Sequence, residues 1–183
     1  MKDKKILSAD NISDFENRCY QTDNKQISIF KNKKKIIVNT PRTEGVALLA
    51  KHSQKINALE VKSASENAMV AITSMDGNAI KNSEKLLLVF STATLNSDMK
   101  LSEDLAFAKE TGKQPALIKT ATLRAKIELG SNKKFKLYAI AINGEVRQEI
   151  PIKQYGNVLE ITLDTSKLKY GATPFFLITK AEQ

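Results

Sequence analysis

Short runs in which apolar and polar residues alternate make up most of the chain from about residue 26 onward. Successive side chains of an extended strand point to opposite faces, so this pattern gathers the apolar side chains on one face. Segment 121–129 shows it clearly, because every second residue from Leu123 to Leu129 is apolar. Segment 86–90 is apolar throughout, which is typical of a central strand buried on both faces.

Turn-forming residues separate these runs. Asn143-Gly144 lies between the β-like segments 135–142 and 145–152, and it predicts a hairpin with a type I′ turn, whose two central positions both need positive φ. Asp76-Gly77 closes another run in the same way. Roughly a dozen short strands at this spacing predict an all-β fold, an antiparallel β-sandwich of jelly-roll type.

Helical periodicity is weak, and we expect at most one or two short helices. Residues 10–20 contain capping residues for one short helix. Segment 96–114 is the least regular, and it is predicted to be a long loop or a single weak helical turn. We divide the chain into an N-terminal extension, residues 1–25, which contains the possible short helix, and a β-sandwich domain, residues 26–183.

The length of 183 residues and the hydrophobic content of 42% suit one globular domain with a sizeable core. No apolar run is long enough for a transmembrane helix, so we expect no membrane partner. The first seven residues carry three lysines with no apolar region behind them, so no signal peptide is expected. The compartment stays open between a cytosolic protein and a mature or excised part of an exported one.

The net charge of +9 invites an anionic partner, but the basic residues are spread over both ends of the chain. This spread argues against nucleic acid, which is usually bound by a focused basic stripe. Only Lys33-Lys34-Lys35, beside Lys31, forms a dense run. The run is interpreted as a solvated hairpin turn, with contact to an acidic partner as the alternative.

Residues for metal or nucleophilic chemistry are scarce. The chain has one histidine, His52, and one cysteine, Cys19, so we expect no disulfide, no metal site and no catalytic triad. His52 follows an apolar run and is interpreted as a surface turn residue. No glycine-rich phosphate loop or dinucleotide fingerprint occurs, and no cofactor is expected.

A pair of carboxylates could in principle hydrolyse glycosides without other groups. The candidates near predicted loops or strand ends are Glu44, Glu84, Glu103 and Asp104. Each has Lys or Arg nearby in the sequence, which favours neutralised or solvated side chains. We therefore predict that the chain is not an enzyme, and a small hydrolase using Glu84 or Glu103 is the weakest alternative.

Aromatic rings are the usual platforms for sugar rings, and this chain has no Trp. Four phenylalanines fall within apolar runs and are predicted to belong to the core: Phe30, Phe90, Phe135 and Phe176. Three tyrosines lie at turns and are the candidate exposed platforms: Tyr20, Tyr155 and Tyr170. A structural role at a sandwich corner is the alternative for each of them.

Two stretches carry a family resemblance. Ile36 to Val46, IIVNTPRTEGV, resembles the V-x-T-P-R-T-x-x-V segment in the C-terminal β-sandwich region of large bacterial glycoside hydrolases. Val70 to Leu88, VAITSMDGNAIKNSEKLLL, is similar to the V-x-x-x-S-L-D-G-x-P-I-x-x-S-x-x-L-L-L segment of the same region. The motifs occur in the same order, and the resemblance extends loosely over residues 20–180. Where those relatives often carry a Trp in the first hairpin, this chain has Ile29-Phe30.

The resemblance implies a non-catalytic accessory domain that packs on a separate catalytic barrel and helps to hold polysaccharide weakly. It also implies a secreted or periplasmic location. On this interpretation Arg42, Tyr155 and Tyr170 are the candidate carbohydrate-binding residues, and a salt bridge inside the fold is the alternative for Arg42. The second functional hypothesis is a basic module that binds another protein or an anionic polymer through Lys31 to Lys35, with no carbohydrate role.

Overall fold

The computed structural model describes residues 7–104 and 106–181, and these fold into antiparallel sheets with three short 3-10 helices. In spatial order, the nine-stranded sheet A contains β1 (Cys19–Gln21), β2 (Ile27–Phe30), β3 (Lys35–Asn39), β4 (Thr43–Leu48), β7 (Ala68–Ser74), β8 (Lys85–Ser91), β18 (Phe175–Lys180), β14 (Phe135–Ile140) and β15 (Val146–Ile150). The five-stranded sheet B contains β16 (Lys153–Tyr155), β17 (Val158–Asp164), β13 (Thr122–Glu128), β6 (Leu59–Ala64) and β5 (Gln54–Lys55). The 3-10 helices are η1 (Lys31–Lys33), η2 (Ile80–Asn82) and η3 (Thr165–Lys167).

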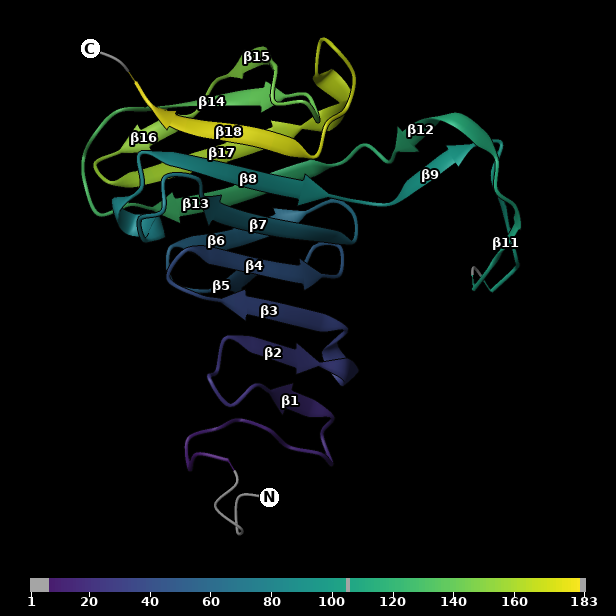
Figure 1. Cartoon of the computed structure of the whole chain (residues 1–183), viewed down its shortest axis with the longest axis horizontal. Coiled ribbons are helices and arrows are strands. Elements are labelled where there is room, and N and C mark those ends of the chain that lie inside the picture. Colours follow the sequence, from purple (N-terminus) through teal and green to yellow (C-terminus); the bar gives the residue numbers. More distant parts are fainter. Residues whose placement is uncertain (1–6, 105, 182–183) are drawn as a thin grey trace.

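Sheet B lies behind the upper strands of sheet A (Figure 1), and the apolar side chains between the two sheets form one core. The predicted alternation holds, because Leu123, Ala125 and Ile127 of β13 are buried between the sheets. The segment 86–90 becomes β8, in which Leu86, Leu88 and Phe90 face the core. The predicted all-β antiparallel sandwich is confirmed, while the jelly-roll topology stays a prediction. No helix of the described residues is long and apolar enough to cross a membrane.

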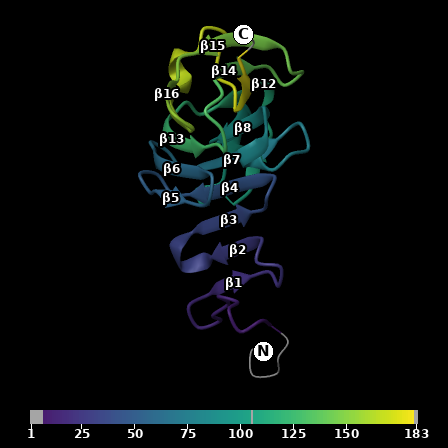
Figure 2. The same cartoon turned by 90° about the vertical axis from the view of Figure 1, so that its left-hand side faces the viewer.

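Strands β1, β2 and β3 continue sheet A past the last strand of sheet B, so the N-terminal part is a single layer (Figures 1 and 2). No helix forms in residues 10–20, and this expectation was wrong. The polar residues that could cap a helix stabilise turns instead: the Asn11 side chain accepts a hydrogen bond from Ser13 N–H and donates one to Thr22 O. Such local side-chain hydrogen bonds compete with helix formation.

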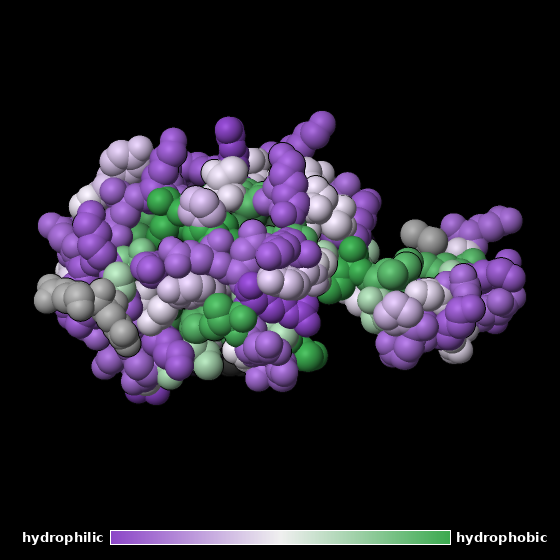
Figure 3. All heavy atoms as spheres, turned by 90° about the horizontal axis from the view of Figure 1, so that it is seen from above, coloured by the Kyte–Doolittle hydropathy of each residue, from purple (hydrophilic) through white to green (hydrophobic). Residues whose placement is uncertain are grey.

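An arm formed by residues 92–119 projects from the body between β8 and β13 (Figures 1 and 3). Its strands are β9 (Thr94–Ser97), β10 (Lys100–Leu101), β11 (Ala108–Glu110) and β12 (Lys113–Ile118). The expectation of a loop or a helical turn was therefore wrong. The two pairs of strands are short and irregular in register, and almost every residue of β11 and β12 is exposed, so no clear period-two pattern marks them in the sequence.

The hairpin around Asn143-Gly144 is confirmed, because β14 and β15 pair antiparallel on either side of it. The type I′ turn is not: Gly144 has φ +84°, whereas Asn143 is not among the residues with positive φ. Gly144 N–H donates to Ala141 O, and the Asn143 side chain accepts from Glu145 N–H. The asparagine side chain thus stabilises a different turn.

Candidate functional site

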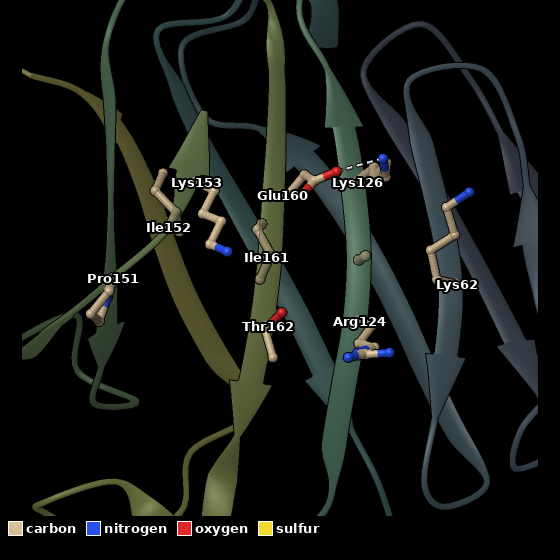
Figure 4. A pocket seen from close by; sticks show the side chains of 10 residues that line it. Lys62, Arg124, Lys126, Pro151, Ile152, Lys153, Glu160, Ile161 and Thr162 are labelled. Atoms are coloured by element: carbon tan, nitrogen blue, oxygen red, sulfur yellow. Dashed lines mark ion pairs between the residues drawn. The ribbon is translucent and has the colours of Figure 1, made fainter. Parts of the chain in front are cut away.

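The outward-facing side chains of sheet B are mostly polar or charged. Because the core-facing residues of β13 and β17 are apolar, the alternate residues between them point outward. On β13 these are Arg124 and Lys126, and on β17 they are Glu160 and Thr162. The registers place Lys126 beside Glu160, and Arg124 beside Thr162. Two neighbouring strands therefore present an ordered row of charges on this face (Figure 4).

Strands β6 and β16 extend the row on both sides. Lys62 points outward from β6, and Lys153 of β16 pairs in register with Glu160. Together they surround an open depression of about 550 Å³ (Figure 4). Its lining residues are Lys62, Arg124, Ala125, Lys126, Pro151, Ile152, Lys153, Glu160, Ile161 and Thr162.

Ion pairs hold part of this face in a fixed arrangement. Lys126 Nζ lies 2.5 Å from Glu160 Oε1, and Lys62 Nζ lies 2.7 Å from Glu60 Oε1. Arg124 and Lys153 form no ion pair with another described residue, so two positive charges stay available to a ligand. The face is therefore polar, partly pre-ordered and positive.

The same ion pairs favour the charged forms of the carboxylates. The hydrogen bond from Lys126 lowers the pKa of Glu160, and the charge of Lys153 adds to this effect. The hydrogen bond from Lys62 likewise lowers the pKa of Glu60. A general acid for glycoside hydrolysis needs the opposite change, a raised pKa. These two carboxylates are therefore suited to binding, and not to proton donation.

Tyr155 lies on the same face as the depression. It follows Lys153 by two residues on β16, so both side chains point outward from sheet B. Its side chain is 61% exposed. Tyr155 pairs in register with Val158, two residues before Glu160, which places this ring beside the charged row. Tyr155 is thus an exposed aromatic ring beside cationic and hydrogen-bonding side chains.

The other two candidate carbohydrate-binding residues lie elsewhere. Tyr170 follows η3, beyond the far end of β17, whereas Tyr155 precedes the near end; a seven-residue strand separates the two positions by roughly 20 Å. Arg147 Nη1 donates to Tyr170 O, and Lys169 Nζ lies 5.2 Å from the Tyr170 ring centroid. Tyr170 thus lies in a separate small cluster.

Arg42 lies in the turn between β3 and β4 of sheet A. Its carbonyl accepts a hydrogen bond from Ser74 N–H, while its side chain is exposed. The salt bridge that the sequence leaves open for Arg42 is not formed with any residue in the described ranges. The three sequence candidates therefore do not form one site, and Tyr155 alone lies beside the depression.

The four carboxylates that the sequence singles out have separate surroundings. Glu44 is 3% exposed, and its carboxylate accepts hydrogen bonds from the N–H groups of Asn57, Ala58 and Leu59 at the start of β6. Glu84 forms ion pairs with Lys133 and Lys180. Glu44 therefore joins sheet A to sheet B, and Glu84 neutralises surface lysines.

Glu103 and Asp104 lie in the arm and are exposed. The hydrogen bond from the Ser102 hydroxyl lowers the pKa of Asp104. His52 is exposed, as expected of a turn residue, and Cys19 is buried. Across residues 7–104 and 106–181, no group of three or more His, Cys, Asp or Glu side chains is arranged to hold a metal ion.

Part of the outer face of sheet A is apolar, in contrast to that of sheet B. Residues in register across six strands form one row on this face: Ile27, Val38, Gly45, Ala71, Val89 and Phe175. A second row runs beside it and contains Ile29, Ile36, Ala47 and Met69. Cross-strand partners share a face, and their chain neighbours Val46, Val70 and Leu88 are buried on the other.

Several of these side chains are open to solvent: Ile27 is 41% exposed, Ile36 43% and Met69 48%. Small residues occupy the centre, where a Cβ on Gly45 would lie 2.9 Å from the Ala71 Cβ. The face is thus flat and spans roughly 24 Å at the usual strand spacing. Contiguous apolar surfaces of this kind usually mark contacts with other proteins.

Neither face was identified from the sequence. The signal was present as the polar residues that alternate with the apolar ones in segments 122–128 and 158–164. However, the sequence does not say which strands are neighbours, and both faces depend on the strand order. The two resembling motifs lie in neighbouring strands of sheet A, the first over β3 and β4 and the second over β7 and β8.

No protein-family model, no curated protein and no solved structure gives a significant match to this chain. The resemblance to glycoside hydrolase accessory domains therefore stays a prediction based on the two motifs.

Proposed function

We propose that the chain is a non-catalytic accessory module that holds polysaccharide weakly on the outer face of sheet B and packs on a catalytic domain through the outer face of sheet A. The observation that carries this proposal is the contrast between the two faces. One is charged and hollowed beside an exposed tyrosine ring, and the other is flat and apolar.

The sugar-binding half rests on the composition of the sheet B face. Tyr155 offers an exposed ring against which a sugar ring can pack. Arg124, Lys153 and Thr162 supply hydrogen-bond donors around the depression, and Thr162 also accepts. The site is open and has one aromatic ring, so it suits a low-affinity contact with an extended chain and not the enclosure of a small molecule.

The absence of catalysis is part of the proposal. The depression contains one carboxylate, Glu160, which is paired with Lys126 and has a lowered pKa. Among the sequence candidates, Glu44 is committed to backbone hydrogen bonds, and Glu84 to ion pairs. Each of these roles is structural, and none favours an acid that gives up a proton near neutral pH.

Affinity electrophoresis against a panel of neutral and acidic polysaccharides tests the binding half. We expect retardation by at least one polysaccharide, with Tyr155→Ala reducing the affinity about tenfold, as loss of one aromatic platform worth ~1.4 kcal/mol would do. Tyr170→Ala is the matched control, because Tyr170 is a similarly exposed tyrosine, 54% against 61%, away from the depression. Equal effects of the two substitutions, or no retardation by any polysaccharide, would reject this half.

The docking half requires a catalytic domain encoded in the same reading frame or in a neighbouring gene. Purified together, the two proteins should form a complex of defined mass in size-exclusion chromatography with light scattering. Met69→Glu should abolish this complex without unfolding the chain, because Met69 is half exposed on the apolar face. Lys62→Glu, on the opposite face, should leave it intact. A complex that survives Met69→Glu places the contact elsewhere.

A further inference from the structure

A second pocket lies where the chain changes from one layer to two. Sheet B ends at β5, while β3 continues sheet A beneath the open edge. Lys35 Nζ of β3 donates a 2.7 Å hydrogen bond to Gln54 Oε1 of β5 and so connects the two sheets at this step. We call the pocket the step pocket; it has a volume of about 390 Å³ and is lined by Asn32, Lys33, Lys34, Lys35, Leu48, Leu49, His52 and Ser53.

The step pocket is surrounded by positive charge that the rest of the described chain does not neutralise. Five lysines lie in η1, the start of β3 and the neighbouring turn: Lys31, Lys33, Lys34, Lys35 and Lys51. None of them is in an ion pair with another described residue, whereas ten lysines elsewhere are. This is therefore the most concentrated unpaired charge on the surface that the structure describes.

The burial of one lysine distinguishes the cluster from a fully solvated turn. Lys35 is half buried, and its desolvation, together with the charge of Lys33, lowers the pKa of its ammonium group. The attraction of a bound anion would offset both the desolvation of Lys35 and its repulsion from Lys33.

We infer that the step pocket binds a sulfate or carboxylate group of an acidic polysaccharide. The inference rests on the proposed function, because the polysaccharide bound on the outer face of sheet B would continue past β5 into the step pocket. Lys55 of β5 points outward in register with Glu60, between the step pocket and the outward row of Lys62, Arg124 and Lys153. Lys55, Arg124 and Lys153, which form no ion pair with another described residue, thus follow the sheet from β5 to β16. This span of roughly 19 Å suits an oligomer and not a single sugar.

A polysaccharide fits this surface better than nucleic acid does. Single-stranded nucleic acids are usually held by bases stacked on exposed aromatic rings. The rings beside the cluster are covered by lysines: Lys31 Nζ lies 5.6 Å from the Tyr20 ring centroid, and Lys35 Nζ lies 5.0 Å from that of Phe30. Tyr155 at the other end of the span is a single ring suited to one sugar.

Affinity electrophoresis with dextran sulfate, polygalacturonate, neutral dextran and duplex DNA tests the inference. The test variant is Lys33→Gln with Lys34→Gln, and both side chains are exposed. Glutamine, like lysine, is unbranched at Cβ, so it should tolerate the positive φ at position 34 as well as lysine does. The matched control is Lys81→Gln with Lys85→Gln, which removes the same charge from two exposed lysines that form no ion pair with another described residue.

The test variant should bind dextran sulfate or polygalacturonate about fivefold more weakly, since each exposed ionic contact changes affinity roughly two- to threefold. Its affinity should also depend less steeply on salt. The control should behave as the unmodified chain, and the more tightly bound of the two polymers identifies sulfate or carboxylate as the group in the pocket.

If the test and control variants lose the same affinity for the acidic polysaccharides, diffuse net charge binds the polymer and the inference is wrong. The inference is also wrong if duplex DNA binds as tightly as both acidic polysaccharides. If Tyr155→Ala abolishes binding to a neutral polysaccharide while the acidic ones bind no better, the inference fails and the proposed function stands. If no polysaccharide is retained at all, both fail.

Discussion

Glu44 joins the two sheets, and replacing it with glutamine tests how the sandwich is held together. Its buried carboxylate accepts hydrogen bonds of 2.8–3.1 Å from the N–H groups of Asn57, Ala58 and Leu59. Glutamine has nearly the same shape but only one accepting oxygen, and its NH₂ group would face donors. All three N–H groups lie within 3.1 Å of Oε2, whereas Oε1 accepts only from the Ala58 N–H at 3.0 Å. An amide oxygen at the Oε2 position therefore keeps the three donors but loses the negative charge, and the NH₂ group at the Oε1 position faces the Ala58 N–H.

The expected cost is about 3 kcal/mol, because hydrogen bonds to a charged acceptor contribute ~1.5–3 kcal/mol and a buried donor that faces another donor costs a similar amount. For a chain of 183 residues this corresponds to a decrease of about 8 °C in Tm. Urea unfolding followed by circular dichroism measures it. Glu149→Gln is the control, since Glu149 forms an exposed ion pair with Lys136, and its loss should change stability by less than ~0.5 kcal/mol.

A Glu44→Gln variant within ~1 kcal/mol of the unmodified chain would refute this reasoning, because it would mean that the backbone donors at the start of β6 find water or other partners. The carboxylate would then not join the sheets, and a role for Glu44 in chemistry would have to be reconsidered.

Two further predictions concern acid stability and the apolar face. Desolvation opposes the charge of Asp76, but hydrogen bonds from Glu84 N–H and the Ser74 hydroxyl outweigh it and hold the pKa of Asp76 well below its usual range. A folded pKa below the unfolded value of ~3.9 gives stability that is complete above about pH 5 and is lost as the pH falls through the folded pKa. Asp76→Asn should therefore reduce the loss of stability between pH 5 and pH 3 in urea titrations, and an unchanged acid profile would contradict this. Gly45→Ala should destabilise the chain by ~1–3 kcal/mol, because the new Cβ would lie 2.9 Å from that of Ala71; a neutral effect on thermal unfolding would show that the two strands can separate without cost.

The sequence was sufficient for the sandwich because each core strand carries its own signal. The alternation in β13 and β17 and the apolar run in β8 come from neighbours along the chain, which the sequence shows directly. The strands within residues 96–114 of the arm could not be predicted, since these exposed strands bury too little to impose a pattern. The helix expected in residues 10–20 failed because Asn11 and Ser13 bond to each other and to the chain near β1.

The candidate site was only partly accessible to sequence reasoning. Tyr155 is exposed, as the sequence predicts. The sequence does not show which turns share an end of the sandwich, so it cannot separate Arg42 and Tyr170 from Tyr155. In the sequence, Arg124 and Lys126 are ordinary outward-facing residues of one strand. Only the strand register shows that they lie beside Thr162 and Glu160. A binding face on a sheet is a property of strand order, and strand order comes from long-range pairing that one sequence does not reveal.

An NMR titration of the ¹⁵N-labelled chain with the polysaccharide fragment that binds best tests the central claim most directly. The account predicts that the amide shifts concentrate in β13, β16 and β17, around Lys126, Tyr155 and Thr162, and for an acidic fragment also at the step pocket. The apolar rows on the outer face of sheet A should stay unchanged. Shifts centred on the sheet A rows or on the arm, or a titration with no shifts at all, would contradict it.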